Sequence, residues 1–590
     1  MNLARGRLAG GLTLAALVLA VGACSASAGE MPERVTLALL PRGASIEQLA
    51  DVRGVSPGLL SAGLGSVPAE QTYLDISQGN RVFDSLYDSP LPIRARGGIC
   101  GPSYSRDVVE RAGLAPAEIE PGLLDSTLRR AGKACQVRSV GMGGLERLVR
   151  GLRGNDLVIA VGRPPPGKDQ ALAIGIAGRG FDGNLTSDST RLDGFVLSTD
   201  IAPTILRRFG IPVPSQMSGQ PIRSEGAVDA AEVVSLGNRL SVISERRGPV
   251  IGLSLLAWLV AFGTAMVASR GRSGRSCARL AALSVIYLPL LLLLCAALEP
   301  SQGVEQGIVT LGAPALGALT LAIFVGYRAL AVASALTVLA YASDVIVGSP
   351  LTSLSLLGPN PGLGVRFYGI GNELEALLGV LIVAGTGAGL TGFAPRLSPR
   401  GCAVAFLSIG LFFAFVFAAG RFGADVGAAI VFPLGAAAAA AAIAARRRRT
   451  ALLVLAAPVA VVALIALIDL VSGANAHLTR SVLDAGGLRS LADVAQRRLQ
   501  LSAHSFTRPI VFVFMPLIAA LVTIAVLRRD RLLAWVHGRP AMRAGLAGAV
   551  AATVIGTLAN DSGALLLEIG TAYLLVFVGF AWAEAEHAST

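Results

Sequence analysis

The sequence predicts an α/β extracytoplasmic domain in residues 30–245, followed by an all-α polytopic membrane bundle in residues 246–590. From about residue 250 onward the chain is a series of apolar runs, each near the ~20 residues that a helix needs to cross a bilayer. Before them, short apolar runs alternate with helical patterns, as in a sheet covered by helices. Residues 1–29 have the layout of an export signal.

The charges of the connecting loops set the predicted direction of each helix. Arginine-rich loops favour the cytoplasm, and here they alternate with loops that are acidic or poor in basic residues. The alternation gives about eleven helices, with residues 30–245 outside and the C-terminus in the cytoplasm. It depends on an interpretation of Gly307–Val347 as two helices with a turn at Arg328. The loop Val471–Thr507 is basic although it is predicted to lie outside, which indicates anion binding.

The amino terminus combines a basic start, an apolar stretch and a short small-residue segment that ends at Cys24. The residues Val21–Cys24 resemble a bacterial lipoprotein box, in which Cys24 is lipidated. A signal that is cut after Ala28 and an uncleaved anchor helix are the alternatives. All three place the following residues outside the cytoplasm, so we expect a multi-pass protein of the bacterial cytoplasmic membrane. Cys100 and Cys135 are a disulfide candidate, because the exported compartment permits oxidation.

The net charge of +12 comes mostly from arginine in loops that are predicted to lie inside. No basic helix with interleaved aromatic residues accompanies it, which argues against a nucleic-acid partner. The expected partners are membrane lipids, together with a lipid-linked glycan or other envelope proteins. The sequence identifies no cofactor.

The exported half contains three apolar runs that are typical of buried strands, at Val35–Leu40, Leu157–Val161 and Leu172–Ile176. Helical stretches such as Ser105–Ala112 and Leu145–Leu152 fall between them. This alternation predicts a mostly parallel sheet covered by helices.

The stretch Leu192–Arg223 reads LDGFVLSTDIAPTILRRFGIPVPSQMSGQPIR. It resembles the closing segment of the alkaline phosphatase/sulfatase/phosphoglycerate mutase superfamily at Asp200–Leu206, Gly210–Pro214 and Met217–Ile222. The resemblance implies an alkaline-phosphatase-like fold in which these residues are structural. Enzymes of that superfamily hold two divalent metals with Asp and His ligands. This exported half has no histidine, and its first strand leads to Leu40–Gly43 without an Asp. We therefore expect a domain that has lost catalytic metals and binds or positions something.

Three polar clusters are predicted to emerge on the outer side of the membrane half, at Arg366–Glu373, Gly420–Asp425 and Asn560–Gly563. Charged residues at membrane depth are costly unless they are paired or hydrated. The clusters therefore predict a polar binding cavity, and ion pairs that cap the bundle are the alternative. Leu351–Asn372 is rich in glycine and proline, which predicts an irregular loop that is buried in protein or lines a wet cavity. The RFYGIGNE and NDSG motifs resemble those of uncharacterised bacterial polytopic membrane proteins, which lends no function.

Carboxylates and arginines in these clusters suit acid–base chemistry on a phosphate-bearing molecule. The catalytic candidates are Glu373, Asp425 and Asp561. The substrate-binding candidates are Arg366, Tyr368, Asn372, Arg421, Arg480, Arg497 and Asn560. We expect Arg366 and Glu373 to face each other across a turn. Arg421 precedes Asp425 by four residues at a helix start, where the helix dipole stabilises the carboxylate.

These residues favour a transferase or ligase of the cell envelope, acting at the outer leaflet on a lipid-linked glycan or a phosphate-bearing headgroup. The first alternative is a transporter or flippase with an extracytoplasmic receptor domain. The second alternative is a non-catalytic envelope scaffold with a pseudo-phosphatase domain. The sequence does not identify the substrate.

Overall fold

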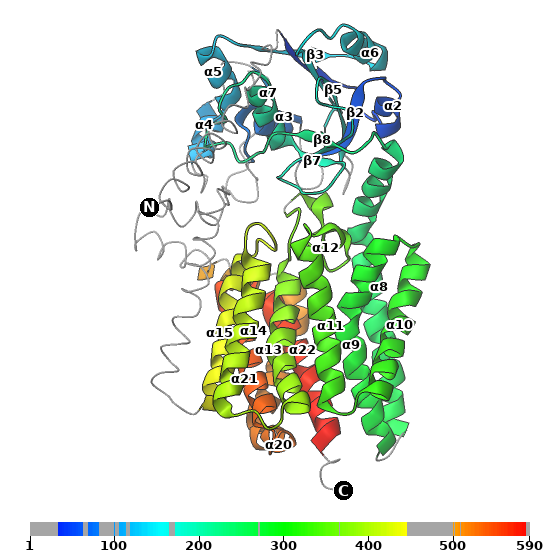
Figure 1. Cartoon of the computed structure of the whole chain (residues 1–590), viewed down its shortest axis with the longest axis vertical. Helices are drawn as coiled ribbons and strands as arrows, with labels where there is room; N and C mark the ends of the chain where they lie inside the picture. Colours follow the sequence, from blue (N-terminus) through cyan, green and yellow to red (C-terminus); the bar gives the residue numbers. More distant parts are fainter. Residues whose placement is uncertain are drawn as a thin grey trace, which may run out of the picture.

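A computed structural model describes residues 34–62, 69–81, 99–100, 106–113, 119–164, 171–268, 272–364, 366–444, 499–500, 502–507 and 509–585. An α/β region stands on one end of a helical region (Figure 1). Three residues singled out above, Cys24, Arg480 and Arg497, lie outside the described residues. So does most of the basic loop Val471–Thr507.

The α/β region contains a six-stranded sheet with the order β3-β1-β4-β5-β2-β7. Its strands are β1 (Val35–Leu39), β2 (Val55–Ser61), β3 (Cys135–Ser139), β4 (Leu157–Val161), β5 (Leu172–Gly178) and β7 (Phe195–Leu197). The sheet is mixed, because β5 runs antiparallel to both of its neighbours while the other pairs are parallel. A short connection joins β4 to β5, and antiparallel neighbours need no crossover helix. Two further strands, β6 (Asn184–Thr186) and β8 (Arg223–Glu225), form a separate antiparallel pair.

Helices cover both faces of this sheet. They are α2 (Ile46–Ala50), α3 (Ala69–Gln78), α4 (Arg106–Gly113), α5 (Leu123–Arg130), α6 (Met142–Arg150), η2 (Ser198–Asp200) and α7 (Ile201–Arg208). Leu37 and Ile159 pack on the side of α5 and α7, whereas Ala38 and Ala160 pack on the side of α2 and α6. Burial on both faces explains why β4 is a continuous apolar run and why β1 is interrupted only by Thr36.

The helical region is built from α8 (Ala230–Ala268), α9 (Arg272–Leu298), α10 (Gln302–Ile323), α11 (Tyr327–Ile346), α12 (Pro350–Leu354), η3 (Pro361–Leu363), α13 (Asn372–Phe393), α14 (Pro399–Ala418), α15 (Val426–Ala444), α19 (Pro509–Leu527), α20 (Arg529–Trp535), α21 (Pro540–Ala559) and α22 (Gly563–Ala585). In the described part of the chain, nine helices are long and apolar enough to cross a membrane, or ten if the bent pair α19–α20 is one span. About eleven were predicted, and the apolar run after Arg449 lies outside the described residues. The predicted break near Arg328 is confirmed, because α10 ends at Ile323 and α11 begins at Tyr327.

Helix α8 carries the chain from the α/β region into the helical region without interruption (Figure 1). The predicted boundary at residue 245 therefore falls inside a continuous helix. The carboxylate of Glu305 on α10 is fully buried. It forms ion pairs with Arg239 Nη2 at 3.1 Å and with Arg246 Nη1 at 3.2 Å. These two ion pairs fix α8 to α10 close to the α/β region.

Candidate functional site

Two of the predicted polar motifs meet beneath the α/β region. The segment 366–371, which precedes α13, lies against the turn 419–425 between α14 and α15, where Ile370 N donates to Gly423 O at 3.4 Å. Gly369 has a φ of +76°, and a β-carbon at this position would overlap the carbonyl of Gly423. Glycine is required here because both the dihedral angle and the space exclude a side chain. We call this contact, together with the part of the α/β region that touches it, the junction.

Asp425 is a buried carboxylate that connects the two segments of the junction. Its Oδ1 lies 3.3 Å from both Nη1 and Nη2 of Arg366, and its Oδ2 accepts a hydrogen bond from Ala428 N at 3.2 Å. Asp425 therefore caps the first turn of α15 and neutralises Arg366, whose side chain remains one-third exposed. The arginine that Asp425 holds is thus Arg366 from the preceding loop, not Arg421.

The expected pairing of Arg366 with Glu373 is wrong. Glu373 Oε1 lies 3.3 Å from Nη1 of Arg247 on α8, whereas Arg366 contacts Asp425. Arg247 also donates to Gly358 O at 2.7 Å, which ties α8 to the irregular loop. The loop before α13 takes a left-handed conformation at Gly369, and the two side chains contact different partners.

The amide side chains of Asn372 and Asn560 connect three helix ends. Asn560 Nδ2 donates to Glu375 Oε2 at 2.7 Å and to Asn372 Oδ1 at 3.2 Å. Asn372 Nδ2 in turn donates to Oδ1 of the exposed Asp561 at 3.2 Å. The structure thus brings Asn372, Asn560 and Asp561 together as a polar chain that runs from the surface to the interior.

Glu375 was missed by the sequence analysis, although it is fully buried at the inner end of this chain. It packs against Gly427, where any β-carbon would overlap its carboxylate oxygens, and its carboxyl group interacts with that of Asp425. Its position three residues after Asn372 in the same helix could have revealed it, because residues at this spacing share a helix face.

The α/β region docks directly on this site through two arginines. Arg191 donates to Arg421 O at 2.6 Å and to Gly420 O at 2.8 Å, and its guanidinium lies over the ring of Tyr368. Arg81 donates to Gly364 O at 2.8 Å and lies over the ring of Phe367. Tyr368 is therefore part of the docking contact, whereas the side chain of Arg421 is exposed.

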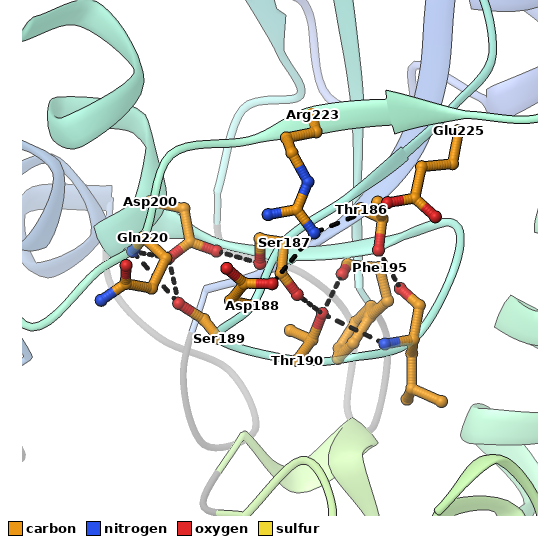
Figure 2. A network of polar contacts seen from close by, with 11 residues as sticks. Thr186, Ser187, Asp188, Ser189, Thr190, Phe195, Asp200, Gln220, Arg223 and Glu225 are labelled. Atoms are coloured by element: carbon orange, nitrogen blue, oxygen red, sulfur yellow. Dashed lines mark hydrogen bonds and ion pairs between the residues drawn. The ribbon is translucent and has the colours of Figure 1, made fainter. Parts of the chain in front are cut away.

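Asp200, in the segment that carries the superfamily resemblance, is a buried hub (Figure 2). Its Oδ2 accepts hydrogen bonds from Ser187 Oγ at 2.7 Å and Leu197 N at 3.0 Å. Its Oδ1 accepts from Ser189 Oγ at 2.6 Å and Gln220 N at 2.8 Å. Burial raises the pKa of Asp200, although these four hydrogen bonds oppose the effect. Asp200 therefore braces the loops around η2.

A neighbouring exposed pair joins Asp188 to Arg223, with Nη2 2.9 Å from Oδ1 (Figure 2). The hydrogen bond from Arg223 lowers the pKa of Asp188. Farther away, Cys100 and Cys135 are joined as a disulfide with their Cα atoms 6.2 Å apart. It ties residue 100 to the start of the edge strand β3.

Comparisons with protein-family models, with curated proteins and with solved structures found no match to this chain. The class of protein is therefore defined by its own fold: a helical region with long apolar helices and an α/β region docked on one end. Both family resemblances noted above remain predictions.

Proposed function

We propose that this chain is a multi-pass protein of the cell envelope that acts as a transferase or ligase on a lipid-linked glycan or a phosphate-bearing lipid headgroup. One observation supports this proposal: a polar chain from exposed Asp561 to the Arg366–Asp425 pair lies at the helix ends, beneath the docked α/β region. Helix ends are where a membrane lipid presents its headgroup. The proposed location is the outer face of the bacterial cytoplasmic membrane.

In this proposal, arginine binds the phosphate. Arg366 is partly exposed and Arg421 is exposed, and their segments are held together by the contact of Gly369 with Gly423. A guanidinium group contacts phosphate oxygens through two parallel hydrogen bonds, which an ammonium group does not reproduce. The carbonyl group of Arg421 accepts a hydrogen bond from Arg191 in the docking contact, so its exposed side chain is left for the ligand.

The general base in this proposal is Asp561. It is the exposed carboxylate of the network, and Asn372 orients it through one hydrogen bond. Glu373 and Asp425 hold Arg247 and Arg366, so we assign them to positioning instead of proton transfer. The α/β region, as an alkaline-phosphatase-like domain without catalytic metals, would position the substrate over this base.

The test is native mass spectrometry of the detergent-purified full chain with a polyprenyl diphosphate, compared with the same polyprenol without phosphate. The proposal expects binding of the diphosphate and an about tenfold loss with Arg421→Gln, the size expected for one charged hydrogen bond. Arg400→Gln is the matched control, because Arg400 is exposed at the opposite end of the bundle. Equal binding of both lipids, or equal binding by Arg421→Gln and wild type, refutes the proposal.

The buried contact between Glu375 and Asp425 favours the transporter or flippase alternative, because ion-coupled carriers place carboxylates among their helix ends. Vesicles with a fluorescent polyprenyl diphosphate separate the two functions. Transport moves the lipid across the bilayer with its mass unchanged, whereas transfer changes the mass of the lipid.

A further inference from the structure

We propose that Glu375 and Asp425 share one bound proton, so that the inner end of the polar chain is a proton-binding site. This site shares Arg366 with the proposed phosphate contacts, but it is argued from the contacts of Glu375 and Asp425 and is tested separately from phosphate binding.

The first support is the burial of an oxygen atom that has no partner. Glu375 is fully buried, and its Oε1 has no hydrogen-bond partner in the described part of the chain, while Oε2 accepts from Asn560. Asp425 is also buried, and its carboxyl group interacts with that of Glu375. Gly427 leaves the space that the Glu375 carboxyl group fills.

The second support is the balance of charge around the pair. The only cationic side chain bonded to either carboxyl group among the described residues is Arg366, which contacts Asp425. The turn between α21 and α22 contributes the neutral Asn560, and its neighbour Asp561 points to Asn372. Glu373 is neutralised separately by Arg247 on α8. Helix α15 carries no ionisable side chain.

Two carboxylates and one guanidinium leave one negative charge in a buried place, which is unfavourable unless another positive charge binds. A proton satisfies this balance and also explains the contact, because two carboxyl groups hydrogen-bond to each other only when one of them is protonated. Binding transfers one proton from hydronium: one O–H bond of hydronium breaks, one carboxyl O–H bond forms and water is released, so no further reactant is needed.

A proton fits better than a metal ion. Ala428 N and Asn560 Nδ2 each donate to one carboxylate oxygen of the pair, so those oxygens already have partners. Within the described residues, no group of three His, Cys, Asp or Glu side chains is arranged to hold a metal. We therefore propose that the site binds a proton, and the test below distinguishes a proton from a sodium ion.

The test is infrared spectroscopy of the detergent-purified full chain at neutral pH, in light and heavy water. The proposal expects a carboxylic acid C=O band that shifts in heavy water. Both Glu375→Gln and Asp425→Asn should remove this band, because Arg366 alone then balances the remaining carboxylate. Arg366→Met should double it, because the pair then needs a second proton, whereas Arg366→Lys should leave it unchanged.

Glu568→Gln is the control for the band's origin, since Glu568 is another partly buried carboxyl group, on α22, and the shared band should survive its loss. A wild-type protein without the band refutes the proposal, as does a band that is undiminished in Glu375→Gln or that disappears in Glu568→Gln. A band that is lost on adding sodium chloride at constant ionic strength assigns the site to sodium and also refutes it. If Arg366→Met fails to fold, the wild-type and Glu375→Gln spectra still decide the question. Polyprenyl diphosphate binding is measured separately, so its failure leaves this result standing.

Discussion

The guanidinium carbon of Arg191 lies 3.9 Å from the ring centroid of Tyr368, so a residue of the α/β region stacks on a residue of the helical region. The same guanidinium donates to two carbonyl groups just after the end of α14. A cation at a helix C-terminus is favourable, because unpaired carbonyl groups gather there. A single side chain therefore holds the RFYGIGNE segment, the GRFGAD turn and the α/β region in one arrangement.

Replacing Arg191 by Ala should weaken this docking. The loss of a cation–π contact and two hydrogen bonds corresponds to about 1–3 kcal/mol. Arg191→Lys should lower stability by an intermediate amount, because lysine keeps the positive charge but lacks the planar guanidinium group that donates to both carbonyl groups. The measurement is the thermal unfolding midpoint of the purified chain, in a double-mutant cycle with Tyr368→Leu. A zero coupling energy would show that the two residues are only neighbours.

Gly369→Ala should destabilise the junction by more than about 2 kcal/mol, because it combines a left-handed backbone with overlap on Gly423. The matched control is Gly389→Ala on α13, where a new β-carbon meets only Ala331 at an ordinary distance of 3.8 Å. That change should be neutral or slightly stabilising. Membrane abundance and thermal midpoint are the readouts, and equal losses in both variants would contradict the assignment.

The pH dependence of stability should reflect Asp200. Its folded-state pKa is raised above the ordinary value of 3.8, so it contributes stability that is fully present below that value. This contribution is lost as the pH rises through the raised folded-state pKa. Asp200→Asn should flatten this part of the pH profile, and it should lower stability at acidic pH because an amide hydrogen then meets Leu197 N or Gln220 N. Parallel melting curves of both proteins against pH would argue against this role.

The predicted membrane topology can be tested with reporter fusions. Fusions after Arg449 and after Arg531 should report the cytoplasm, because arginine-rich loops favour the inside. Fusions in Ala474–Leu488 should report the exterior, because one predicted span separates this loop from each of those two sites. An exterior signal from the fusion after Arg449 would contradict the predicted orientation of the helices and would place the junction on the cytoplasmic side.

Three strands of the sheet, β1, β4 and β5, could be predicted from the sequence, whereas β2 and the edge strands could not. β2 is fully buried, but Pro57 and Gly58 interrupt its apolar run. β4 is an uninterrupted apolar run at the predicted bounds, and β1 ends one residue before its predicted end. β3 was missed because four of its five residues are exposed and carry no apolar pattern. The reversed direction of β5 was also missed, because strand direction depends on a connection and not on periodicity.

The position of the three polar motifs at one end of the helical region could likewise be predicted from the sequence. Which side chains pair with each other there could not. Loop charges placed RFYGIGNE, GRFGAD and NDSG at one end of the bundle, and their side chains meet there. Which carboxylate Arg366 meets depends on the left-handed backbone at Gly369 and its contact with Gly423, and a pattern of charges does not encode this. Arg191 lies in the other region of the chain, so nothing local in the sequence linked it to Tyr368.

Helix α8 has a mechanical consequence. Its 39 residues form a rod about 60 Å long at 1.5 Å per residue, twice the thickness of a bilayer's hydrocarbon core. Because a helix is stiff along its axis, a push on the sheet tilts the rest of α8, and the ion pairs of Glu305 transfer that tilt to α10. Pro249 lies within the rod and lacks the amide hydrogen that would stiffen it, so bending concentrates there. A force on the α/β region is thus transmitted along α8 into the helical region, and α8 bends most easily at Pro249.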